Sequence, residues 1–310
     1  MILSQNCVGI DVSKHFLDIF DAGVRQRIVN HYDAVASCAA RWADMNAFVV
    51  FEATGSYDGA LGAALQAAGV RFARVNPARV RDFARACGRI AKTDAIDAET
   101  LARYAQALQP APAEASSAAR KTLALMAKRR DQLIAMRVQE KNRRENDHPF
   151  MAEQTARAIT FLNGEIAALD AAIAQCIAAD PELRRDAELL RSAPGVGPVA
   201  AMQLLARMPE LGRIGSKQIA SLAGLAPMNV DSGAFRGKRC IKGGRKRVRD
   251  ALYMAALNAA RSAGFKAFYK RLRAAGKPAK LALIALARKL LGVLNAILKT
   301  QKPYQPTSAT

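Results

Sequence analysis

Short apolar runs alternate with helical patterns over residues 1–112. The apolar runs predict strands at 8–10, 16–20, 24–30, 47–51 and 70–75, and the helical spacing predicts helices at 35–45, at 59–68 and from Asn76 onward. Three strands precede the first helix, and helices separate the later strands. This order predicts an α/β domain in which helices pack on a mixed sheet. The continuous run Ala47–Phe51 is typical of a central strand, which is buried on both faces.

Residues 113–190 have a different pattern. Helical spacing covers 116–145 and 152–178, and the segment Asn146-Asp-His-Pro149 interrupts it. Two long helices with a short break between them predict an antiparallel hairpin or coiled-coil linker. The hairpin could serve self-association of the chain or act as a simple spacer. An amphipathic pattern does not show which surface its apolar side packs against, so both roles stay open.

Residues 191–300 predict a mainly α-helical domain, and a polar tail follows at 301–310. Helices are expected at 199–208, 219–225, 248–262 and 279–299, with a polar, basic loop before the third of these. The glycine-containing turn Ser192–Pro198 resembles a helix-hairpin-helix element. In such an element backbone N–H groups meet a DNA phosphate, so Gly195 and Gly197 are candidate nucleic-acid contacts. The alternative is an ordinary glycine turn between packed helices.

The net charge of +21, from 47 Lys and Arg against 26 Asp and Glu, indicates a polyanionic partner, and nucleic acid comes first. A membrane partner is not expected, because no run approaches ~20 uninterrupted apolar residues. The start of the chain also lacks a signal-peptide pattern, so we expect a cytoplasmic, nucleoid-associated protein. Five scattered cysteines and three histidines argue against a zinc site or a disulfide framework.

Four carboxylates stand at informative positions. Asp11 and Glu52 end apolar runs, and Asp94 and Asp97 lie three residues apart at the start of a predicted helix. If the runs are strands, all four can converge at one end of the sheet, where repulsion between them favours a bound cation. Mg²⁺ takes such oxygen ligands and can act on a phosphodiester. The alternative is that Asp94 and Asp97 cap the helix and that the other two are ordinary strand-end acids. Glu99 lies off the face that Asp94 and Asp97 share.

A basic loop follows the glycine turn. Between residues 236 and 249 it holds eight basic residues and no acid, and its glycines allow close approach to a phosphate. The candidate nucleic-acid contacts here are Arg236, Lys238, Arg239, Lys242, Arg245, Lys246, Arg247 and Arg249. Ser232 stands at the head of this loop. A serine is a poor nucleophile unless its surroundings stabilise the alkoxide, so the pattern alone favours a turn residue.

Six motifs occur in a fixed order: Gly-Ile-Asp11-Val-Ser-Lys, Glu52-Ala-Thr-Gly-Ser-Tyr, Lys-Thr-Asp94-Ala-Ile-Asp97-Ala, Pro-Gly-Val-Gly-Pro198, Leu-Ala-Gly-Leu-Ala-Pro227 and Ser232-Gly followed by Gly-Lys-Arg and Ile-Lys-Gly-Gly-Arg245. Together they resemble the DEDD-type insertion-sequence transposases, the bridge-RNA-guided recombinases. The resemblance extends from Gly9 to about Leu298 and is weakest in the helical middle.

The resemblance implies a RuvC-like domain of the ribonuclease H class at 1–112, in which Asp11, Glu52, Asp94 and Asp97 bind Mg²⁺ or Mn²⁺. It implies that Ser232 attacks the DNA backbone and forms a transient protein–DNA phosphoester. It further implies donor and target DNA, a structured guide RNA and a homo-oligomer, from dimer to tetramer, as partners. Two alternatives stay open: a metal-dependent junction nuclease that uses water, and a nucleic-acid-binding protein without catalysis.

Overall fold

The computed structural model of this chain describes residues 6–53, 57–88, 94–113, 117–143, 148–229, 231–232, 235–237 and 239–306, and gives only the backbone of 94–96, 231–232 and 235–236. The chain forms two units, Met1–Ala115 and Ser116–Thr310. The predicted helical linker falls in the second unit with the C-terminal helices. Its boundary with the predicted domain 191–300 stays a prediction.

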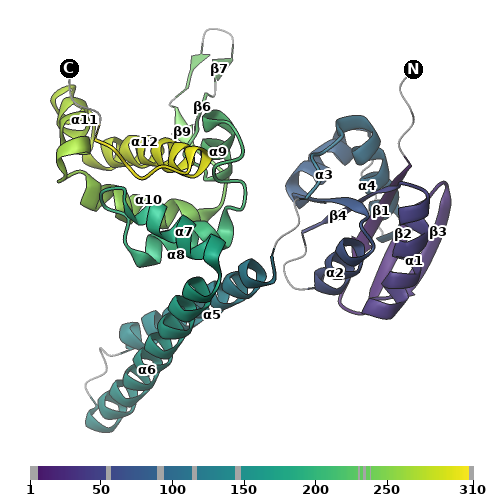
Figure 1. The fold of residues 1–310 in the computed structure, drawn as a ribbon, viewed down its shortest axis with the longest axis horizontal. Helices are drawn as coiled ribbons and strands as arrows, with labels where there is room; N and C mark the ends of the chain where they lie inside the picture. The colour runs from purple at the N-terminus through teal and green to yellow at the C-terminus, as the bar shows by residue number, and fades with distance from the viewer. Residues whose placement is uncertain are drawn as a thin grey trace. The chain divides into compact units, whose positions relative to one another are not determined.

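A five-stranded sheet organises the first unit, in the order β3-β2-β1-β4-β5 (Figure 1). The strands are β1 (Cys7–Val12), β2 (Phe16–Asp21), β3 (Val24–Val29), β4 (Phe48–Glu52) and β5 (Arg71–Val75). β1, β2 and β3 pair antiparallel, whereas β1, β4 and β5 pair parallel, which confirms the predicted mixed sheet. β1 and β4 are almost wholly buried, as their apolar runs predict, and the edge strand β3 is exposed and carries Arg25 and Arg27.

Helices cover both faces of this sheet. They are α1 (Tyr32–Asp44), α2 (Gly59–Ala67), α3 (Pro77–Ala86) and α4 (Asp94–Leu108). Trp42 of α1 and Leu61 of α2 pack with Ile10 of β1 on one face. On the other face Val80 of α3 and Leu101 of α4 pack with neighbouring positions of the strands. Successive strand residues alternate between the faces, so each core takes every second residue.

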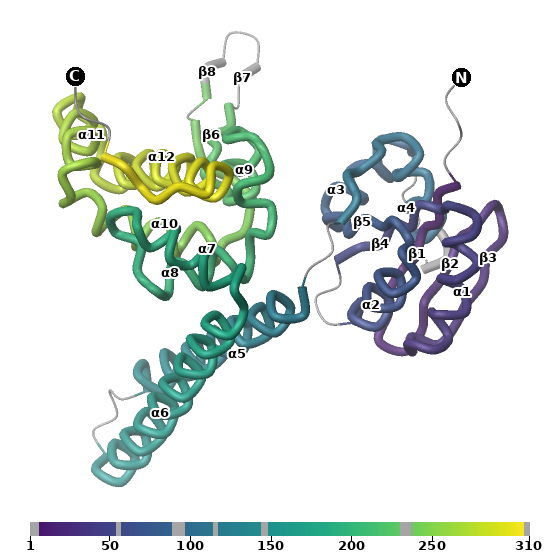
Figure 2. Tube along the Cα trace, viewed as in Figure 1, coloured from purple at the N-terminus to yellow at the C-terminus, as the bar shows by residue number. Residues whose placement is uncertain are grey.

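The second unit is helical. Its helices are α5 (Ala118–Arg143), α6 (Pro149–Ala179), α7 (Pro181–Arg191), α8 (Pro198–Arg207), α9 (Ser216–Leu222), α10 (Lys246–Ala259), α11 (Ala263–Ala274) and α12 (Ala279–Thr300). α5 and α6 lie side by side as the predicted hairpin, shown as a tube in Figure 2. The other helices share one apolar core, to which α12 contributes many of its residues. The helices expected from the sequence did not include α7 and α11.

Two of these helices are long and apolar enough to cross a membrane, α6 with a mean hydropathy of 1.3 and α12 with 1.9 over the most apolar window. Length and composition alone do not separate a membrane span from a core helix. α12 is the central helix of the core, and Leu162 and Ile166 of α6 pack against Leu133 of α5. Packing inside the protein therefore accounts for the apolar character of α12 and of one side of α6.

Candidate functional site

Asp11 and Glu52 stand beside each other at the ends of two parallel strands. In the register of β1 and β4, Ile10 lies opposite Phe51, and the next residues along the two strands are Asp11 and Glu52. Both side chains are partly buried. The expected convergence of these two acids therefore follows directly from the observed pairing of two buried strands.

Helix α4 crosses β1 two residues before Asp11. A Cβ atom on Gly9 would lie 2.0 Å from the Ala98 carbonyl oxygen and 2.5 Å from the Ala102 nitrogen, so only glycine allows this approach. Asp97 immediately precedes Ala98 on α4. Gly9 and Asp11 project from the same face of β1, because they are two residues apart. The crossing therefore brings the segment that contains Asp97 to the face on which Asp11 and Glu52 lie.

Glu99 of α4 pairs with two arginines. Its carboxylate accepts a hydrogen bond of 2.7 Å from Arg25 of β3 and forms an ion pair of 2.8 Å with Arg103, one turn along the helix. The expectation that Glu99 points away from the face that Asp94 and Asp97 share stays a prediction. Glu99 fastens α4 to the edge strand of the sheet.

Asp18 extends the acidic row across the sheet. It lies directly opposite Asp11 on β2, and Arg27 lies directly opposite Asp18 on β3. Arg27 donates two hydrogen bonds of 2.9 Å to the buried Asp18 carboxylate. Cross-strand neighbours project from one face, so Asp18 is a further acid beside Asp11. Asp18 was not among the predicted acids, because one Asp within an alternating strand has no distinguishing spacing.

The predicted metal ligands are described only in part. Asp94 is the first residue of α4, and its side chain lies outside the described part of the chain. Among the side chains that the structure describes, no three His, Cys, Asp or Glu are arranged to hold a metal ion. Two carboxylates on adjacent strand ends suit a hard cation, and a complete donor set needs the helix acids as well. The four-acid site stays a prediction.

Part of the predicted basic loop lies in a β-ribbon arm, which we define as the described residues of the range 227–241. Its short strands are β6 (Pro227–Met228), β7 (Asp231–Ser232), β8 (Phe235–Arg236) and β9 (Cys240–Ile241), with β6 paired to β9 and β7 to β8. Ser232 lies in β7 opposite Phe235, and its side chain is outside the description. The sequence did not predict these strands, because strands of two residues leave no periodic signal.

Two glycines close the base of the arm. A Cβ atom on Gly244 would lie 2.1 Å from the Gly224 nitrogen, and both residues adopt positive φ angles of 70° and 68°. Arg249 donates a hydrogen bond of 2.6 Å to the Gly243 carbonyl. The backbones before and after the arm therefore meet at a contact that no larger residue permits.

The basic residues of the arm and of the segment after it differ in their ion pairs and in their exposure. Arg245 forms two hydrogen bonds of 2.6 Å with Glu210, Arg247 forms an ion pair of 3.2 Å with Asp131, and Lys246 forms one of 2.7 Å with Asp250. Arg239 and Lys242 are exposed, whereas Lys238 and the Arg236 side chain lie outside the described residues. A nucleic-acid role for the set stays a prediction, and for Arg245 the structure gives a clear internal role.

The glycine turn before α8 packs against α10. A Cβ atom on Gly195 would lie 2.3 Å from the Ala255 carbonyl oxygen and 2.6 Å from the Ala259 nitrogen, whereas Gly197 borders open space. Close helix packing is therefore sufficient to explain Gly195. Phosphate contact at Gly195 and Gly197 stays a prediction.

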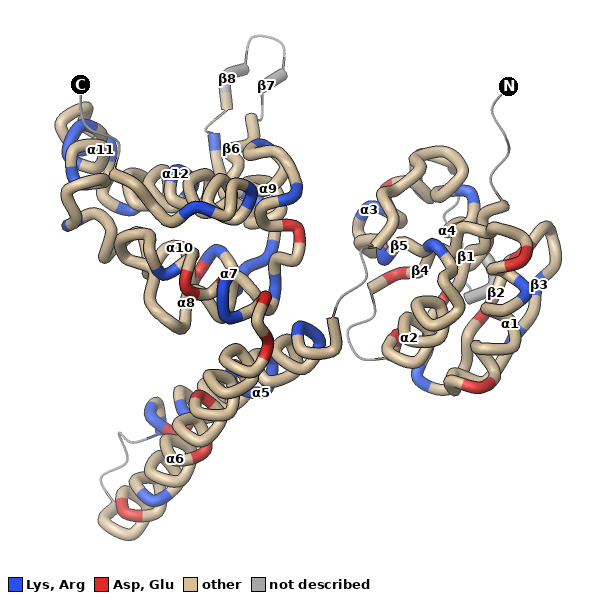
Figure 3. Tube along the Cα trace, viewed as in Figure 1, with Lys and Arg blue, Asp and Glu red and all other residues tan. Residues whose placement is uncertain are grey.

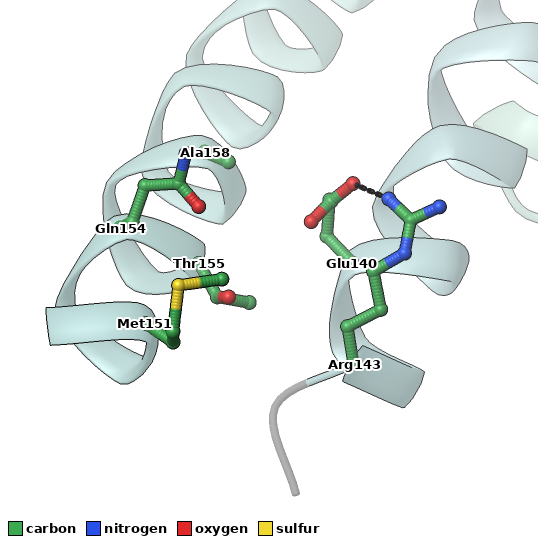
Figure 4. Close-up of a pocket in the computed structure, with 6 residues that line it drawn as sticks. All are labelled: Glu140, Arg143, Met151, Gln154, Thr155 and Ala158. Atoms are coloured by element: carbon green, nitrogen blue, oxygen red, sulfur yellow. Dashed lines mark hydrogen bonds and ion pairs between the residues drawn. The ribbon is translucent and has the colours of Figure 1, made fainter. Parts of the chain in front are cut away.

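A cavity of about 560 Å³ opens between the end of α5 and the start of α6 (Figure 4). Glu140, Arg143, Met151, Gln154, Thr155 and Ala158 line it. Arg143 forms an ion pair of 2.5 Å with Glu140. Among the described side chains, none of those predicted to be catalytic lines this cavity.

Comparison with known proteins places these features in a class. Residues 8–146 match a family model described as a transposase of the DEDD type of IS110, and residues 187–270 match the model of the transposase IS116/IS110/IS902 family. The first match includes Asp11, Glu52, Asp94 and Asp97, and the second includes the arm with Ser232. Both models are those of transposases, which act on DNA.

Similar proteins match over part of their length. The chain is 32% identical over 261 residues to the pilin gene-inverting protein of Moraxella bovis, which covers 83% of this chain and 81% of the relative. It is 34% identical over 163 residues to an uncharacterized 42 kDa protein of insertion element IS900 from Mycobacterium paratuberculosis, covering 50% and 41% of the two chains. The chain belongs to the IS116/IS110/IS902 family of transposases and is a DNA transposase or recombinase. DEDD-type transposases are in general metal-dependent.

Proposed function

We propose that this protein catalyses RNA-guided DNA strand exchange by transesterification, with Ser232 as the nucleophile and an acidic metal site in a RuvC-like domain. The observation that carries the proposal is the placement of Asp11 and Glu52 at adjacent strand ends on the face that α4 crosses. Asp94 and Asp97 begin that helix, so the sequence supplies the remaining two acids of the set.

Asp11, Glu52, Asp94 and Asp97 would hold Mg²⁺ or Mn²⁺, which when bound neutralises charge on the scissile phosphate. The Ser232 oxygen attacks the phosphorus and loses its proton to solvent. One P–O bond of the DNA backbone breaks as the Ser–O–P bond forms, and a free deoxyribose hydroxyl leaves. A hydroxyl of the exchanged strand later attacks the phosphoserine and releases Ser232. Because each step exchanges one phosphodiester for another, no ATP is needed.

We propose that a structured RNA from the mobile element pairs with donor and target DNA and selects the sites, in an oligomer of this chain. Base pairing would then provide sequence choice, and the protein would need only contacts to the nucleic-acid backbone. The net charge of +21 suits such contacts. The Moraxella bovis relative is named a pilin gene-inverting protein, and inversion of a DNA segment would be one outcome of such an exchange.

The acids alone would also serve a junction nuclease that uses water, and a variant pair separates the two mechanisms. Ser232→Ala should abolish strand exchange between labelled donor and target duplexes in the presence of Mg²⁺ and the element's RNA, while DNA and RNA binding stays at the wild-type level. Ser221→Ala, at an exposed position of α9, is the matched control and should recombine normally. Full recombination by Ser232→Ala would reject the serine nucleophile.

A further inference from the structure

The last part of the chain is basic without interruption. Residues 251–310 contain eleven Lys and Arg and no Asp or Glu, so more than half of the net charge of +21 arises there. The basic residues are Arg261, Lys266, Lys270, Arg271, Arg273, Lys277, Lys280, Arg288, Lys289, Lys299 and Lys302, and all of them are exposed. This charge lies outside the arm and the basic segment that follows it.

Three of these residues form a stripe on α11, which we call the α11 stripe: Lys266, Lys270 and Arg273. Their spacing of i, i+4 and i+7 places them within about 60° on the helix and over about 10 Å of its length. The opposite side of α11 is apolar, and Phe265 on it is buried in the helical core. The packing of α11 therefore turns the stripe outward, and Figure 3 shows basic positions along this helix.

The α11 stripe lacks the acidic partners that Arg245 and Arg247 have. Among the residues that the structure describes, Lys266, Lys270 and Arg273 form no ion pair. Arg273 donates only to the backbone carbonyl of Lys277, at 2.6 Å. Cations without acids repel one another, and an external anion would relieve that repulsion.

Beside the stripe, two further cations share one aromatic ring. The guanidinium of Arg271 lies 5.3 Å and the ammonium of Lys289 lies 4.6 Å from the centre of the Phe268 ring. The ring attracts each cation, yet it also holds two like charges of α11 and α12 close together. The seam between the two helices therefore presents concentrated positive charge next to the stripe.

A solvated surface that merely keeps the protein soluble would mix both signs of charge. Sixty residues with no acid do not fit that description. The stripe itself carries no aromatic side chain, whereas single-stranded nucleic acid is bound by aromatic residues on which its bases stack. A row of exposed cations on a helix suits phosphates along a duplex, which are contacted without reading sequence.

We propose that the α11 stripe binds the phosphate backbone of duplex DNA, as a surface separate from the Ser232 arm. This inference rests on charge, spacing and membership in a DNA transposase family, and it does not require the serine mechanism. A Ser232→Ala protein should therefore bind duplex DNA through the stripe as wild type does, so failure of either proposal leaves the other testable.

The test is fluorescence anisotropy with a random-sequence duplex of about 30 base pairs over a series of salt concentrations, with the full chain. The triple variant Lys266→Gln, Lys270→Gln and Arg273→Gln should lose at least about tenfold in affinity, and the slope of log K against log salt should fall by about 3. The charge-preserving triple Lys266→Arg, Lys270→Arg and Arg273→Lys should bind as wild type. All three positions are exposed, and thermal melting checks that each variant is folded.

The matched control removes three other charges. Arg85, Arg143 and Arg157 are exposed and already paired with Asp82, Glu140 and Glu153. The triple variant with Gln at these three positions should change affinity and slope much less than the stripe variant does. Equal losses in both triples, or an unchanged slope in the stripe variant, would overturn the proposal. A stripe variant that loses only binding of single-stranded RNA would also overturn it and assign the surface to RNA.

Discussion

Glu210 accepts hydrogen bonds from both terminal nitrogens of Arg245, at 2.6 Å each. Arg245 is the N-cap residue of α10 and follows the arm closely in the sequence. Its side chain also donates a hydrogen bond of 2.8 Å to the carbonyl oxygen of Arg207, at the end of α8. Its own backbone nitrogen donates to Leu222 of α9. The pair therefore fastens the returning end of the Ser232 arm to two helices of the core.

Glu210→Gln should loosen the arm at its base. The variant leaves Arg245 partly buried without its counter-charge, which should lower the free energy of unfolding by roughly 1–3 kcal/mol. Hydrogen exchange should speed up in residues 222–245, and strand exchange should slow while duplex binding is kept. Glu153→Gln, which breaks the exposed pair with Arg157, is the control and should leave the unfolding free energy, the hydrogen exchange and the strand exchange unchanged. If hydrogen exchange in the arm is as slow in Glu210→Gln as in wild type, the Glu210–Arg245 pair does not hold the arm in place.

The same pair predicts a dependence on acid. Burial raises the pKa of Glu210, but the hydrogen bond from Arg245, the charge of Arg245 and a backbone hydrogen bond together hold that pKa below its usual value. The pKa of Glu210 is lower in the folded protein than in the unfolded chain, where it is about 4.3. The ion pair therefore stabilises the folded protein fully at pH values above about 4.3, and this stabilisation is lost as the pH falls through the pKa of the folded state. The stability difference between wild type and Glu210→Gln should therefore shrink from about pH 6 to about pH 3 in urea melts. A stability difference that stays constant from about pH 6 to about pH 3 would show that ionised Glu210 is not the group that stabilises the folded protein.

Gly9→Ala tests the crossing of β1 and α4. The added methyl would meet the backbone of Ala98 and Ala102, so α4 would have to shift, at a cost of about 1–3 kcal/mol in unfolding free energy. Strand exchange should fall as well, because α4 carries Asp94 and Asp97. Gly62→Ala is the control: this glycine of α2 has nothing within 4 Å, so alanine should be neutral or stabilising. If thermal melting shows Gly9→Ala as stable as Gly62→Ala, the close approach of α4 is wrong.

Asp94→Asn tests the predicted metal site. Removing one carboxylate should lower the strand-exchange rate by about 10²-fold or more and weaken binding of Mn²⁺ measured by titration calorimetry. Asp82→Asn removes an exposed acid of α3 and serves as the control for lost negative charge. Wild-type Mn²⁺ affinity in Asp94→Asn would remove this residue from the site.

The sheet was predictable because its strands are buried runs with a clear period. Val8, Ile10, Val49 and Phe51 are fully buried, and burial of that kind leaves continuous apolar residues in the sequence. Asp11 and Glu52 each end one of these runs, so their places at the ends of two strands could also be predicted. The acids of α4 were recognised by their spacing on one helix face.

Other features depend on contacts between distant residues and leave no local pattern. The arm pairs strands of two residues whose register is fixed at its base by Gly224 and Gly244. Arg245 belongs to a basic run, and only the fold shows that Glu210 neutralises it. α11 is an exception, because its apolar side and its basic stripe form an amphipathic pattern that could have predicted it.

The most direct test of the serine mechanism is a search for the protein–DNA phosphoester. Purified protein is incubated with labelled DNA, Mg²⁺ and the element's RNA, and the products are separated on a denaturing protein gel. We expect a labelled protein band in wild type and in Ser221→Ala that is absent in Ser232→Ala. Cut DNA without a labelled band, formed equally by Ser232→Ala, would show that the enzyme uses water and that Ser232 is not the nucleophile.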